Sequence, residues 1–311
     1  MNSLVAIVGP TGVGKSRLAL SLARAFHGEI VNADSRQIYR YLDIGTAKPT
    51  PEELSLVPHH LIDIINPDED FSLAQYQKLA YQTIDNIQRE NKLPFLVGGS
   101  GLYIRAVIEG WRIPEVPPDT RLRQALEERA AEIGAAGLFQ ELLEVDPAAA
   151  EKIDPRNIRR VIRALEVQQK TNRLFSELQR KEPPPYHTYI IGLTAERDEL
   201  YRRVDRRIDE MIAGGLVTEV EILRQMGYDF KLSAMSSIGY RQIVQFLNGA
   251  LTLEAAIQQI KTETHRLVRH QYAWFRRKDP GIHWFDIEKD VENTIRESLA
   301  EFMELEQENH Q

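Results

Sequence analysis

The hydrophobic pattern of the chain predicts short buried strands that alternate with amphipathic helices. Continuous apolar runs are typical of strands covered on both faces, and they lie at residues 4–8 and 95–97. Residues 29–33 and 59–64 are also expected to form short strands. Helical spacing of apolar positions is found at residues 17–26, 71–91 and 102–109. This alternation indicates an α/β fold, with a parallel sheet flanked by helices.

The pattern changes over residues 114–185, where strand-like runs disappear. Proline clusters mark both ends of this segment, as is common at domain boundaries; they comprise Pro117, Pro118, Pro183, Pro184 and Pro185. Helices are expected at residues 120–133, 135–145, 147–153 and 157–170. We therefore expect an all-helical insertion domain over residues 114–185 within an α/β catalytic core formed by residues 1–113 and 186–311.

The last third of the chain returns to one strand and then to helices. The strand is expected at residues 186–194, and the helices at residues 196–213, 216–226, 239–247 and 253–277. On the last helix Ile260, Leu267 and Trp274 recur at seven-residue spacing, which predicts that they face the core. The acidic end from Glu301 is expected to fray.

The segment between the first strand and the first helix fits the phosphate-loop pattern G-x-x-x-x-G-K-[ST]. Its residues are Gly9, Pro10, Thr11, Gly12, Val13, Gly14, Lys15 and Ser16. Glycines let backbone N–H groups turn toward a phosphate, the helix N-terminus adds partial positive charge, and Lys15 adds a full charge. The Ser16 hydroxyl is a candidate ligand for Mg²⁺. A diphosphate or triphosphate is therefore expected here, and the alternative is a chance glycine turn.

Two more strand ends carry candidate residues. Asp34 follows the strand at 29–33, and Gly98-Gly99-Ser100-Gly101 follows the strand at 95–97. Ligands of open α/β sheets bind at the carboxyl ends of the strands, so we expect both segments near the phosphate loop. A phosphate loop with such a carboxylate first suggests a small-molecule kinase. Alternatively, Asp34 caps the next helix or pairs with an arginine.

Composition narrows the function classes. The chain of 311 residues has no cysteine, which excludes disulfides, a thiol nucleophile and cysteine zinc sites. Neither a basic-then-apolar leader nor an apolar run of membrane-spanning length occurs, so we expect a cytoplasmic protein that does not enter a membrane. The net charge is −7, yet residues 156–163 hold four arginines and no acid. Such local basic surface suits a structured anionic partner, although solvated helix faces are the alternative.

Taken in order, the motifs resemble those of the tRNA dimethylallyltransferase family. Besides the phosphate loop they are Asp34-Ser35-Arg36-Gln37-Ile38-Tyr39, Gly45-Thr46-Ala47-Lys48-Pro49, Gly98-Gly99-Ser100-Gly101-Leu102-Tyr103, Arg159-Arg160-Val161-Ile162-Arg163-Ala164-Leu165-Glu166 and Ser237-Ile238-Gly239-Tyr240-Arg241-Gln242. The resemblance implies an α/β core like that of P-loop NTPases. It also implies a Mg²⁺-dependent monomer that transfers a dimethylallyl group from dimethylallyl diphosphate to N6 of adenosine 37, beside the anticodon in the anticodon loop of tRNA, and releases diphosphate.

The same resemblance implies roles for single residues. Residues 11–16 match the family's prenyl-diphosphate cradle, Asp34 matches its general base, and Arg207 matches an arginine that faces the diphosphate. Contacts with tRNA are implied for Asp34, Ser35, Arg36, Gln37, Arg159, Arg160, Val161, Ile162 and Arg163. Ser100 stands where the family usually has threonine and keeps the hydroxyl, so a catalytic or tRNA contact can survive there. His265 and His270 replace the usual arginines of the last long helix.

Other interpretations stay open from the residues alone. The chain can be a small-molecule kinase, a prenyltransferase for free adenine nucleotides, or an RNA-binding module with a vestigial phosphate loop. Arg207 can pair with acids one helical turn away, and the arginines of 159–163 can be solvated surface. His59 and His60 point to opposite faces of a strand, which argues against a shared metal site. Tyr103 and Trp111 are expected in the core rather than as base-stacking platforms.

Overall fold

The computed structural model describes residues 2–114, 116, 119–178, 180–182, 186–287 and 291–308. The chain divides into two compact units. The first, here called the core unit, comprises Met1–Ile108 and Pro185–Gln311, and the second, the helical unit, comprises Glu109–Pro184. The proline clusters that suggested the boundaries lie outside the described residues. None of the described helices is long and apolar enough to cross a membrane.

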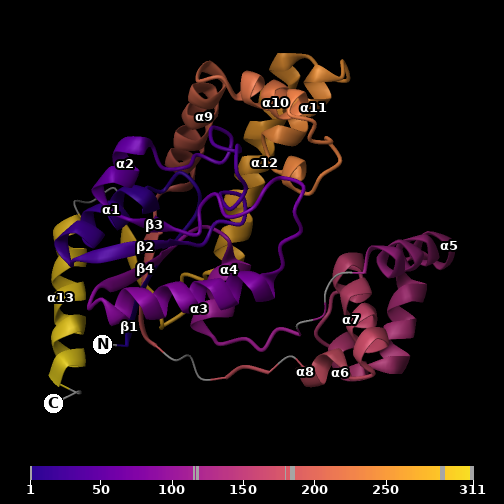
Figure 1. The fold of residues 1–311 in the computed structure, drawn as a ribbon, viewed down its shortest axis with the longest axis horizontal. Helices are drawn as coiled ribbons and strands as arrows, with labels where there is room; N and C mark the ends of the chain where they lie inside the picture. Colours follow the sequence, from indigo (N-terminus) through magenta and orange to yellow (C-terminus); the bar gives the residue numbers. More distant parts are fainter. Residues whose placement is uncertain are drawn as a thin grey trace. The chain divides into compact units, whose positions relative to one another are not determined.

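The core unit is built on one parallel sheet (Figure 1). Its strands are β1 (Ser3–Val8), β2 (Gly28–Asn32), β3 (His59–His60), β4 (Leu93–Val97), β5 (His187–Thr194) and β6 (His283–Asp286). They lie in the order β3-β2-β4-β1-β5-β6, and every pairing is parallel. The predicted fold class is confirmed, whereas β6 was not predicted because its four residues lack a distinct apolar run.

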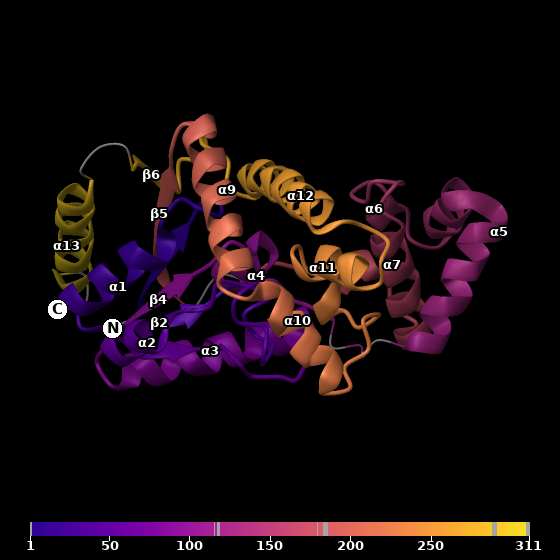
Figure 2. The ribbon, with the colours of Figure 1, turned by 90° about the horizontal axis from the view of Figure 1, so that it is seen from above.

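Helices cover both faces of this sheet (Figure 2). On one face, α3 (Leu73–Arg89) and α4 (Gly101–Ile108) pack against Leu4, Ala6 and Val8 of β1. On the other, α1 (Lys15–Ala25) and α13 (Glu292–Glu308) belong to the core that contains Val5 and Ile7. Successive residues of β1 therefore enter opposite cores, which explains its unbroken apolar sequence.

The C-terminal helix α13 corrects the expectation of a frayed acidic end. Ile295 and Leu299 are completely buried against the sheet, and the helix continues to Glu308. Ser298 adds a hydrogen bond to the hydroxyl of Tyr189 on β5 at 2.5 Å. The acidic residues that suggested fraying occupy the helix together with an apolar stripe, and burial of that stripe holds the helix in place.

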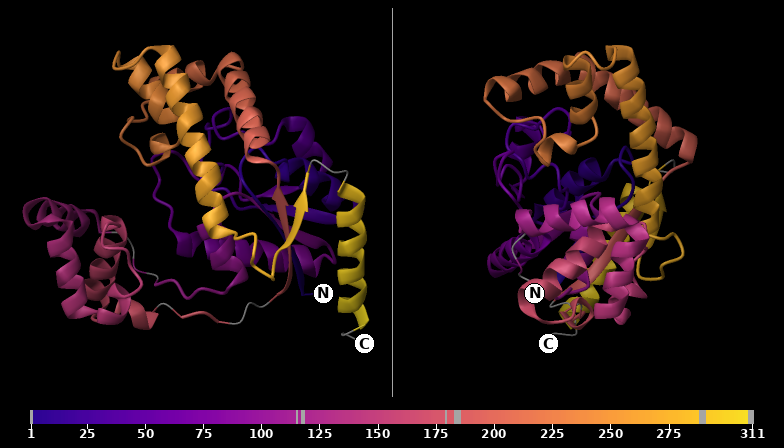
Figure 3. Two further views of the ribbon diagram at one scale, coloured as in Figure 1. Left: turned by 180° about the vertical axis from the view of Figure 1, so that it is seen from behind. Right: turned by 90° about the vertical axis from the view of Figure 1, so that its right-hand side faces the viewer.

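Four helices follow β5 and stand over the carboxyl edge of the sheet (Figure 3). They are α9 (Arg197–Ala213), α10 (Leu216–Gln225), α11 (Tyr240–Leu247) and α12 (Leu253–Trp274), with the short 3-10 turn Ala234–Ser236 before α11. The predicted core stripe of α12 is wrong at two positions, because Leu267 and Trp274 are 37% and 40% exposed. The buried positions are Ala256, Ile260, Val268 and Gln271, which follow the 3.6-residue period of a straight helix rather than a period of seven.

The segment between β2 and α3 holds two further corrections. Instead of a strand over residues 59–64, only His59–His60 pairs, because Leu61 and Asp63 adopt left-handed backbone conformations with φ of 62° and 56°. The helix α2 (Pro51–Leu56) was not predicted. Its start is marked by a capping box, in which Thr50 and Glu53 bond each other's backbone N–H groups.

The helical unit consists of α5 (Thr120–Val145), α6 (Pro147–Ala150), α7 (Ile158–Thr171) and α8 (Phe175–Leu178). Gly134 interrupts α5 with a φ of 78°, which matches the two separate helices expected there. The unit has its own apolar core, which includes Leu138, Leu142 and Leu165. Since a core of this kind makes a unit independently compact, the prediction of an all-helical insertion in the fold is confirmed.

Candidate active site

Three neighbouring strands deliver three loops to the carboxyl edge of the sheet. The phosphate loop of residues 9–14 follows β1, the glycine loop of residues 98–101 follows β4, and Asp34 follows β2. Because β4 lies between β1 and β2, the glycine loop lies between the other two. Backbone hydrogen bonds connect the loops: Gly98 donates to Ile7 at 3.4 Å, and Ser100 donates to Ala33 at 3.3 Å.

The phosphate loop has the strand–loop–helix geometry that its sequence predicts. Gly14 is the N-cap of α1 with a φ of 98°, a left-handed conformation that favours glycine, and no side chain caps the helix. The first-turn N–H groups are therefore not occupied by a capping side chain. The Lys15 Nζ donates to the carbonyl oxygens of Gly9 and Pro10, both at 2.9 Å, and Ser16 is exposed beside it.

Charges of both signs meet at these loops without pairing. Burial lowers the pKa of Lys15 to about 8, while Asp34 raises it and Arg207 lowers it further. Burial likewise lowers the pKa of Arg207 and Asp34 opposes the shift. Within the described part of the chain, neither Asp34 nor Arg207 forms an ion pair. Half-buried charges that act on one another yet stay unpaired are typical of a ligand site.

The carboxylate of Asp34 is held by a local turn. Its Oδ1 accepts the N–H of Arg36 at 2.8 Å, and its own N–H donates to Asn32 Oδ1 at 3.1 Å. The bond to Arg36 agrees with the alternative interpretation of Asp34 as a capping residue, but it occupies only one of the two carboxylate oxygens. The adjacent Ser35 N–H donates to Ser100 Oγ at 3.0 Å, and Ser100 Oγ donates to Ser35 Oγ at 3.2 Å. The hydroxyl of Ser100 therefore connects the glycine loop to the turn that carries Asp34.

The two residues after Ser35 are engaged within the protein. Arg36 donates to the carbonyl of Ser233 at 3.1 Å. Gln37 donates to the carbonyls of Thr46 and Ala47, each at 3.1 Å. Their predicted contact with tRNA stays a prediction.

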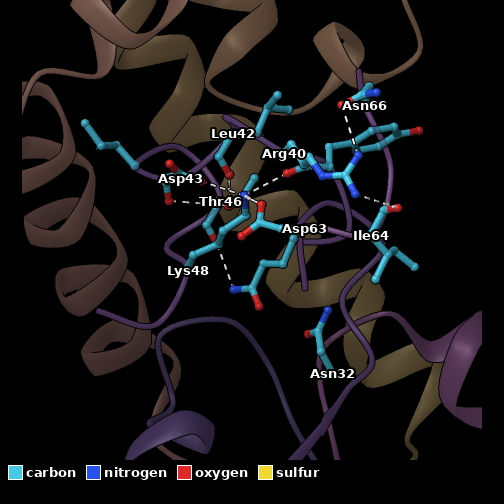
Figure 4. A network of polar contacts seen from close by, with 12 residues as sticks. Asn32, Arg40, Leu42, Asp43, Thr46, Lys48, Asp63, Ile64 and Asn66 are labelled. Atoms are coloured by element: carbon cyan, nitrogen blue, oxygen red, sulfur yellow. Dashed lines mark hydrogen bonds and ion pairs between the residues drawn. The ribbon is translucent and has the colours of Figure 1, made fainter. Parts of the chain in front are cut away.

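A buried lysine organises the segment after Asp34 (Figure 4). The side chain of Lys48 is only 6% exposed, and its Nζ donates to the Tyr39 carbonyl at 2.7 Å, to Asp43 at 2.5 Å and to Asp63. Arg40 adds a hydrogen bond to Asn66 at 3.1 Å. The ammonium group of Lys48 and the carboxylates of Asp43 and Asp63 are paired with one another. These contacts therefore fix the backbone of the loop after Asp34, although it has no regular secondary structure.

Glu219 of α10 connects two of the quoted motifs. Its carboxylate accepts the N–H groups of Asp43, Ile44 and Gly45 at 3.0, 2.7 and 3.3 Å, and the Tyr240 hydroxyl at 2.5 Å. Burial raises the pKa of Tyr240, and the charge of Glu219 raises it further. The hydroxyl of Tyr240 therefore stays protonated and donates to Glu219. Sequence reasoning missed Glu219, because three consecutive N–H groups that grip a distant carboxylate leave no local signal.

Gln271 is a second residue whose role sequence reasoning missed. Its Oε1 accepts the N–H of Thr11 in the phosphate loop at 2.8 Å, and its Nε2 donates to the carbonyl of Gly99 at 3.1 Å. The residue is 6% exposed. The signal was available, since a glutamine that lies on the same helical face as Ile260 and Val268 needs buried polar partners.

The predicted tRNA-contacting residues of the helical unit separate into two groups. Arg159 and Arg160 are exposed and make no side-chain hydrogen bond to the described residues. Val161 and Ile162 are 1% and 4% exposed and pack in the core of the unit, and their predicted contact with tRNA stays a prediction. Arg163 donates to Glu166 at 2.6 Å and to two backbone carbonyls, which makes it part of the fold.

Most of the remaining aromatic and histidine candidates contact other residues of the protein, whereas His270 is exposed. Tyr103 is 8% exposed and stacks on Tyr76 with centroids 3.9 Å apart, as expected for a core residue. His265 stacks on Tyr201 at 3.9 Å and contacts Asp205 at 2.8 Å, so it joins α12 to α9. His60 contacts Glu29 at 2.6 Å. Trp111, expected in the core, is partly exposed, with its Nε1 donating to Glu109 at 2.8 Å.

The fold and the three loops define a class: α/β proteins with a phosphate loop at the carboxyl edge of a parallel sheet. Residues 37–278 match the family model described as IPP transferase. A tRNA dimethylallyltransferase of Dehalococcoides mccartyi is 53% identical over 300 residues, covering 96% of this chain and 92% of the relative. One of a Roseiflexus species is 54% identical over 277 residues, covering 89% and 91%. The chain belongs to the IPP transferase family.

Solved structures agree with this assignment. The full-length tRNA isopentenylpyrophosphate transferase of Bacillus halodurans is 42% identical, with a TM-score of 0.72 over 99% of this chain and 100% of that one. A eukaryotic dimethylallyltransferase captured acting on tRNA is 26% identical, with a TM-score of 0.81 over 96% of this chain and 78% of that one. These similarities cover the core unit and the helical unit together.

Proposed function

We propose that this chain transfers a dimethylallyl group from dimethylallyl diphosphate to N6 of adenosine 37 in tRNA. Family membership supports prenyl transfer to tRNA, and the finer assignment rests on the site. The observation that carries it is the convergence of Lys15 and Arg207 on the same loops as the carboxylate of Asp34, while neither cation pairs with a carboxylate of the described residues. Two cations suit a diphosphate leaving group, and one carboxylate suits a proton acceptor.

The proposed step is a substitution at the allylic carbon C1. The lone pair of N6 forms the new C–N bond, while the C1–O bond breaks and its electrons leave with the diphosphate. Lys15, Arg207 and the first-turn N–H groups of α1 stabilise the charge that develops on the departing oxygens. The Oδ2 of Asp34 takes the N6 proton, and the turn at Arg36 holds the carboxylate in orientation. The adenine must leave its stack to reach this edge, which costs least in a single-stranded loop.

The residues present fit Mg²⁺ when it is shared with a diphosphate. In the part of the chain that the structure describes, no group of three or more acidic or histidine side chains forms a metal site. A bound Mg²⁺ commonly takes one or two protein oxygens plus phosphate oxygens and water, and the hydroxyl of Ser16 offers one such oxygen. When bound, the ion would neutralise charge on the leaving group.

The proposal extends to the surroundings of the site. We place a tRNA contact at Arg159 and Arg160, because these exposed arginines form no side-chain bond to the described residues, whereas Arg163 does. Guanidinium groups bind RNA phosphates and add a salt-dependent term to affinity. We also propose that the protein acts as a monomer and that it acts in the cytoplasm.

The test is prenyl transfer to unmodified tRNA with dimethylallyl diphosphate, read by mass spectrometry of the tRNA nucleosides. We expect a dimethylallyl mass increment on adenosine 37, and its loss in Lys15→Ala. Transfer of a γ-phosphate from ATP to a small acceptor, without label in tRNA, would instead identify a kinase. Activity on free AMP or ATP without RNA would identify a nucleotide prenyltransferase. Intact activity in Lys15→Ala would exclude the phosphate loop from the reaction.

A further inference from the structure

The side chain of Gln271 is the only group in the described residues that hydrogen-bonds both the phosphate loop and the glycine loop through one functional group. We propose that Gln271 is a positioning residue for prenyl transfer, which sets the spacing between the diphosphate site and the loop that carries Ser100. This inference rests on the proposed function and deepens it. The sequence marks Gln271 only as a glutamine on the buried face of α12, so the assignment depends on the geometry of its two bonds.

The contacts fix the orientation of the amide. The N–H of Thr11 can only donate, so it faces Oε1, and the carbonyl of Gly99 can only accept, so it faces Nε2. A flipped amide would set donor against donor and acceptor against acceptor. Because Gln271 is 6% exposed, water does not replace either bond readily. The amide is therefore locked between two backbones.

The approach of the amide to Gly99 is close. A Cβ on Gly99 would lie 2.4 Å from Nε2 of Gln271 and 3.9 Å from Nζ of Lys15. Only glycine leaves room for the amide there, and the amide lies beside the lysine that is proposed to meet the diphosphate. A change in the length of this link would consequently move the glycine loop relative to the phosphate loop.

The link continues to the proposed general base. Gly99 precedes Ser100, whose hydroxyl bonds both the N–H and the hydroxyl of Ser35, next to Asp34. A continuous path therefore runs from Thr11 through Gln271, Gly99 and Ser100 to the Asp34 turn. The same helix is joined to α9, which carries Arg207, through Lys261 with Asp209 and His265 with Asp205. Thus α12 fixes three parts of the site that belong to different elements.

The geometry separates two roles for the bond to Thr11. If Gln271 is a strut, meaning a fixed link between the two loops, its bond to Thr11 persists when diphosphate binds. The Thr11 N–H is then not a phosphate ligand. If Gln271 instead competes with phosphate for that N–H, its removal would tighten diphosphate binding. The strut is the role we infer, because the second bond to Gly99 would have no purpose in simple competition.

The experiment compares Gln271→Met, Gln271→Glu and the matched control Gln259→Met in the full-length protein. Methionine keeps the side-chain length and loses both bonds, whereas glutamate keeps the acceptor for Thr11 and sets an oxygen against the carbonyl of Gly99. Gln259 is an exposed glutamine on the same helix. We expect kcat to fall about 10- to 100-fold in both Gln271 variants, since misplacement near 1 Å costs about that much. Inorganic diphosphate affinity and the KM for tRNA should stay close to the wild-type values. Tm should fall in both Gln271 variants, because buried backbone groups lose their partners, so kcat is measured well below the Tm of each variant.

A double-mutant cycle with Ser100→Ala tests whether the path acts as a unit. We expect the loss in kcat of Gln271→Met and Ser100→Ala together to be much smaller than the product of the single losses. Multiplicative losses, an unchanged kcat, or tighter diphosphate binding in Gln271→Met would each overturn the inference. Wild-type activity is read in the same assay, so an inactive wild-type protein contradicts the proposed function, whereas the ratio of variant to wild type reports on Gln271 alone.

Discussion

The core unit and the helical unit use their cations in opposite ways. In the core unit, Lys15 and Arg207 are half-buried and bind no carboxylate within the described residues. In the helical unit, Arg123 and Arg163 hold Glu166, whose side chain is completely buried. Burial of an unpaired charge costs stability, and a fold tolerates that cost where a ligand supplies the missing partner.

The contrast shows that the partner of a cation tells more about its role than its position in a motif. Arg159, Arg160 and Arg163 stand in one motif and share a helix, yet among the residues that the structure describes only Arg163 has side-chain partners. Four predictions test this comparison, and they follow in order from the largest expected effect to the smallest.

The largest effect is expected for Asp34→Asn in the core unit. Asparagine keeps an oxygen for the N–H of Arg36 and removes the proton acceptor. We expect kcat for prenyl transfer to fall about 10²-fold or more, because general bases contribute about that much. Single-turnover transfer to tRNA measures it, with Asp70→Asn, an exposed aspartate, as the control. A large loss of diphosphate affinity with an unchanged chemical step would assign Asp34 to binding instead.

The second effect is structural and belongs to the helical unit. Glu166→Ala leaves Arg123 and Arg163 without the carboxylate that they share. We expect a loss of about 2 kcal/mol, below the value for fully buried pairs because both arginines remain partly exposed. Amide hydrogen exchange should show it in α7, while protection of β1 and β4 stays the same. An equal loss of amide protection in both units would mean that they unfold together, which would contradict this prediction.

The third effect is the pH dependence of that contribution. Burial alone would raise the pKa of Glu166, but bonds from Arg123, the Asp119 N–H and Arg163 bring the pKa below its usual 4.5. A depressed carboxylate pKa stabilises the folded state above the unfolded pKa, and this contribution is lost as the pH falls through the folded pKa. The difference in α7 protection between wild type and Glu166→Ala should therefore narrow below about pH 4.5. A difference that stays constant down to acid pH would contradict this.

Much of the core unit follows from local sequence, because its strands and its phosphate loop are continuous segments. The run 4–8, the glycines and Lys15 define one strand–loop–helix unit whose geometry depends on nearby residues only. The position of Asp34 after a strand likewise predicts its place at the carboxyl edge. What local sequence cannot give is the order of the strands, which inserts β4 and its glycine loop between the other two loops.

The missed residues are those whose partners lie far along the chain. Glu219 contacts Asp43 and Gln271 contacts Thr11, separations of 176 and 260 residues. Neither pairing leaves a pattern with a period of two or 3.6. The error at Trp274 has the same origin, since heptad spacing suggests burial but tertiary packing selects Val268 and Gln271 instead. Local periodicity identifies an element, whereas its buried face depends on what it packs against.

The smallest effect is expected at the free cations of the helical unit. Replacement of Arg159 and Arg160 by glutamine should weaken tRNA binding several-fold and lower the slope of log affinity against log salt by about one per lost phosphate contact. The step after binding should not change, because neither residue belongs to the core unit. Binding titrations at several salt concentrations measure the slope, with Arg24→Gln as the control, an exposed arginine in the last turn of α1. If the slope of the double variant equals that of the control, Arg159 and Arg160 are solvated surface. Ligand-binding cations would then be confined to the core unit, and the helical unit would contribute only the paired cations that hold its fold.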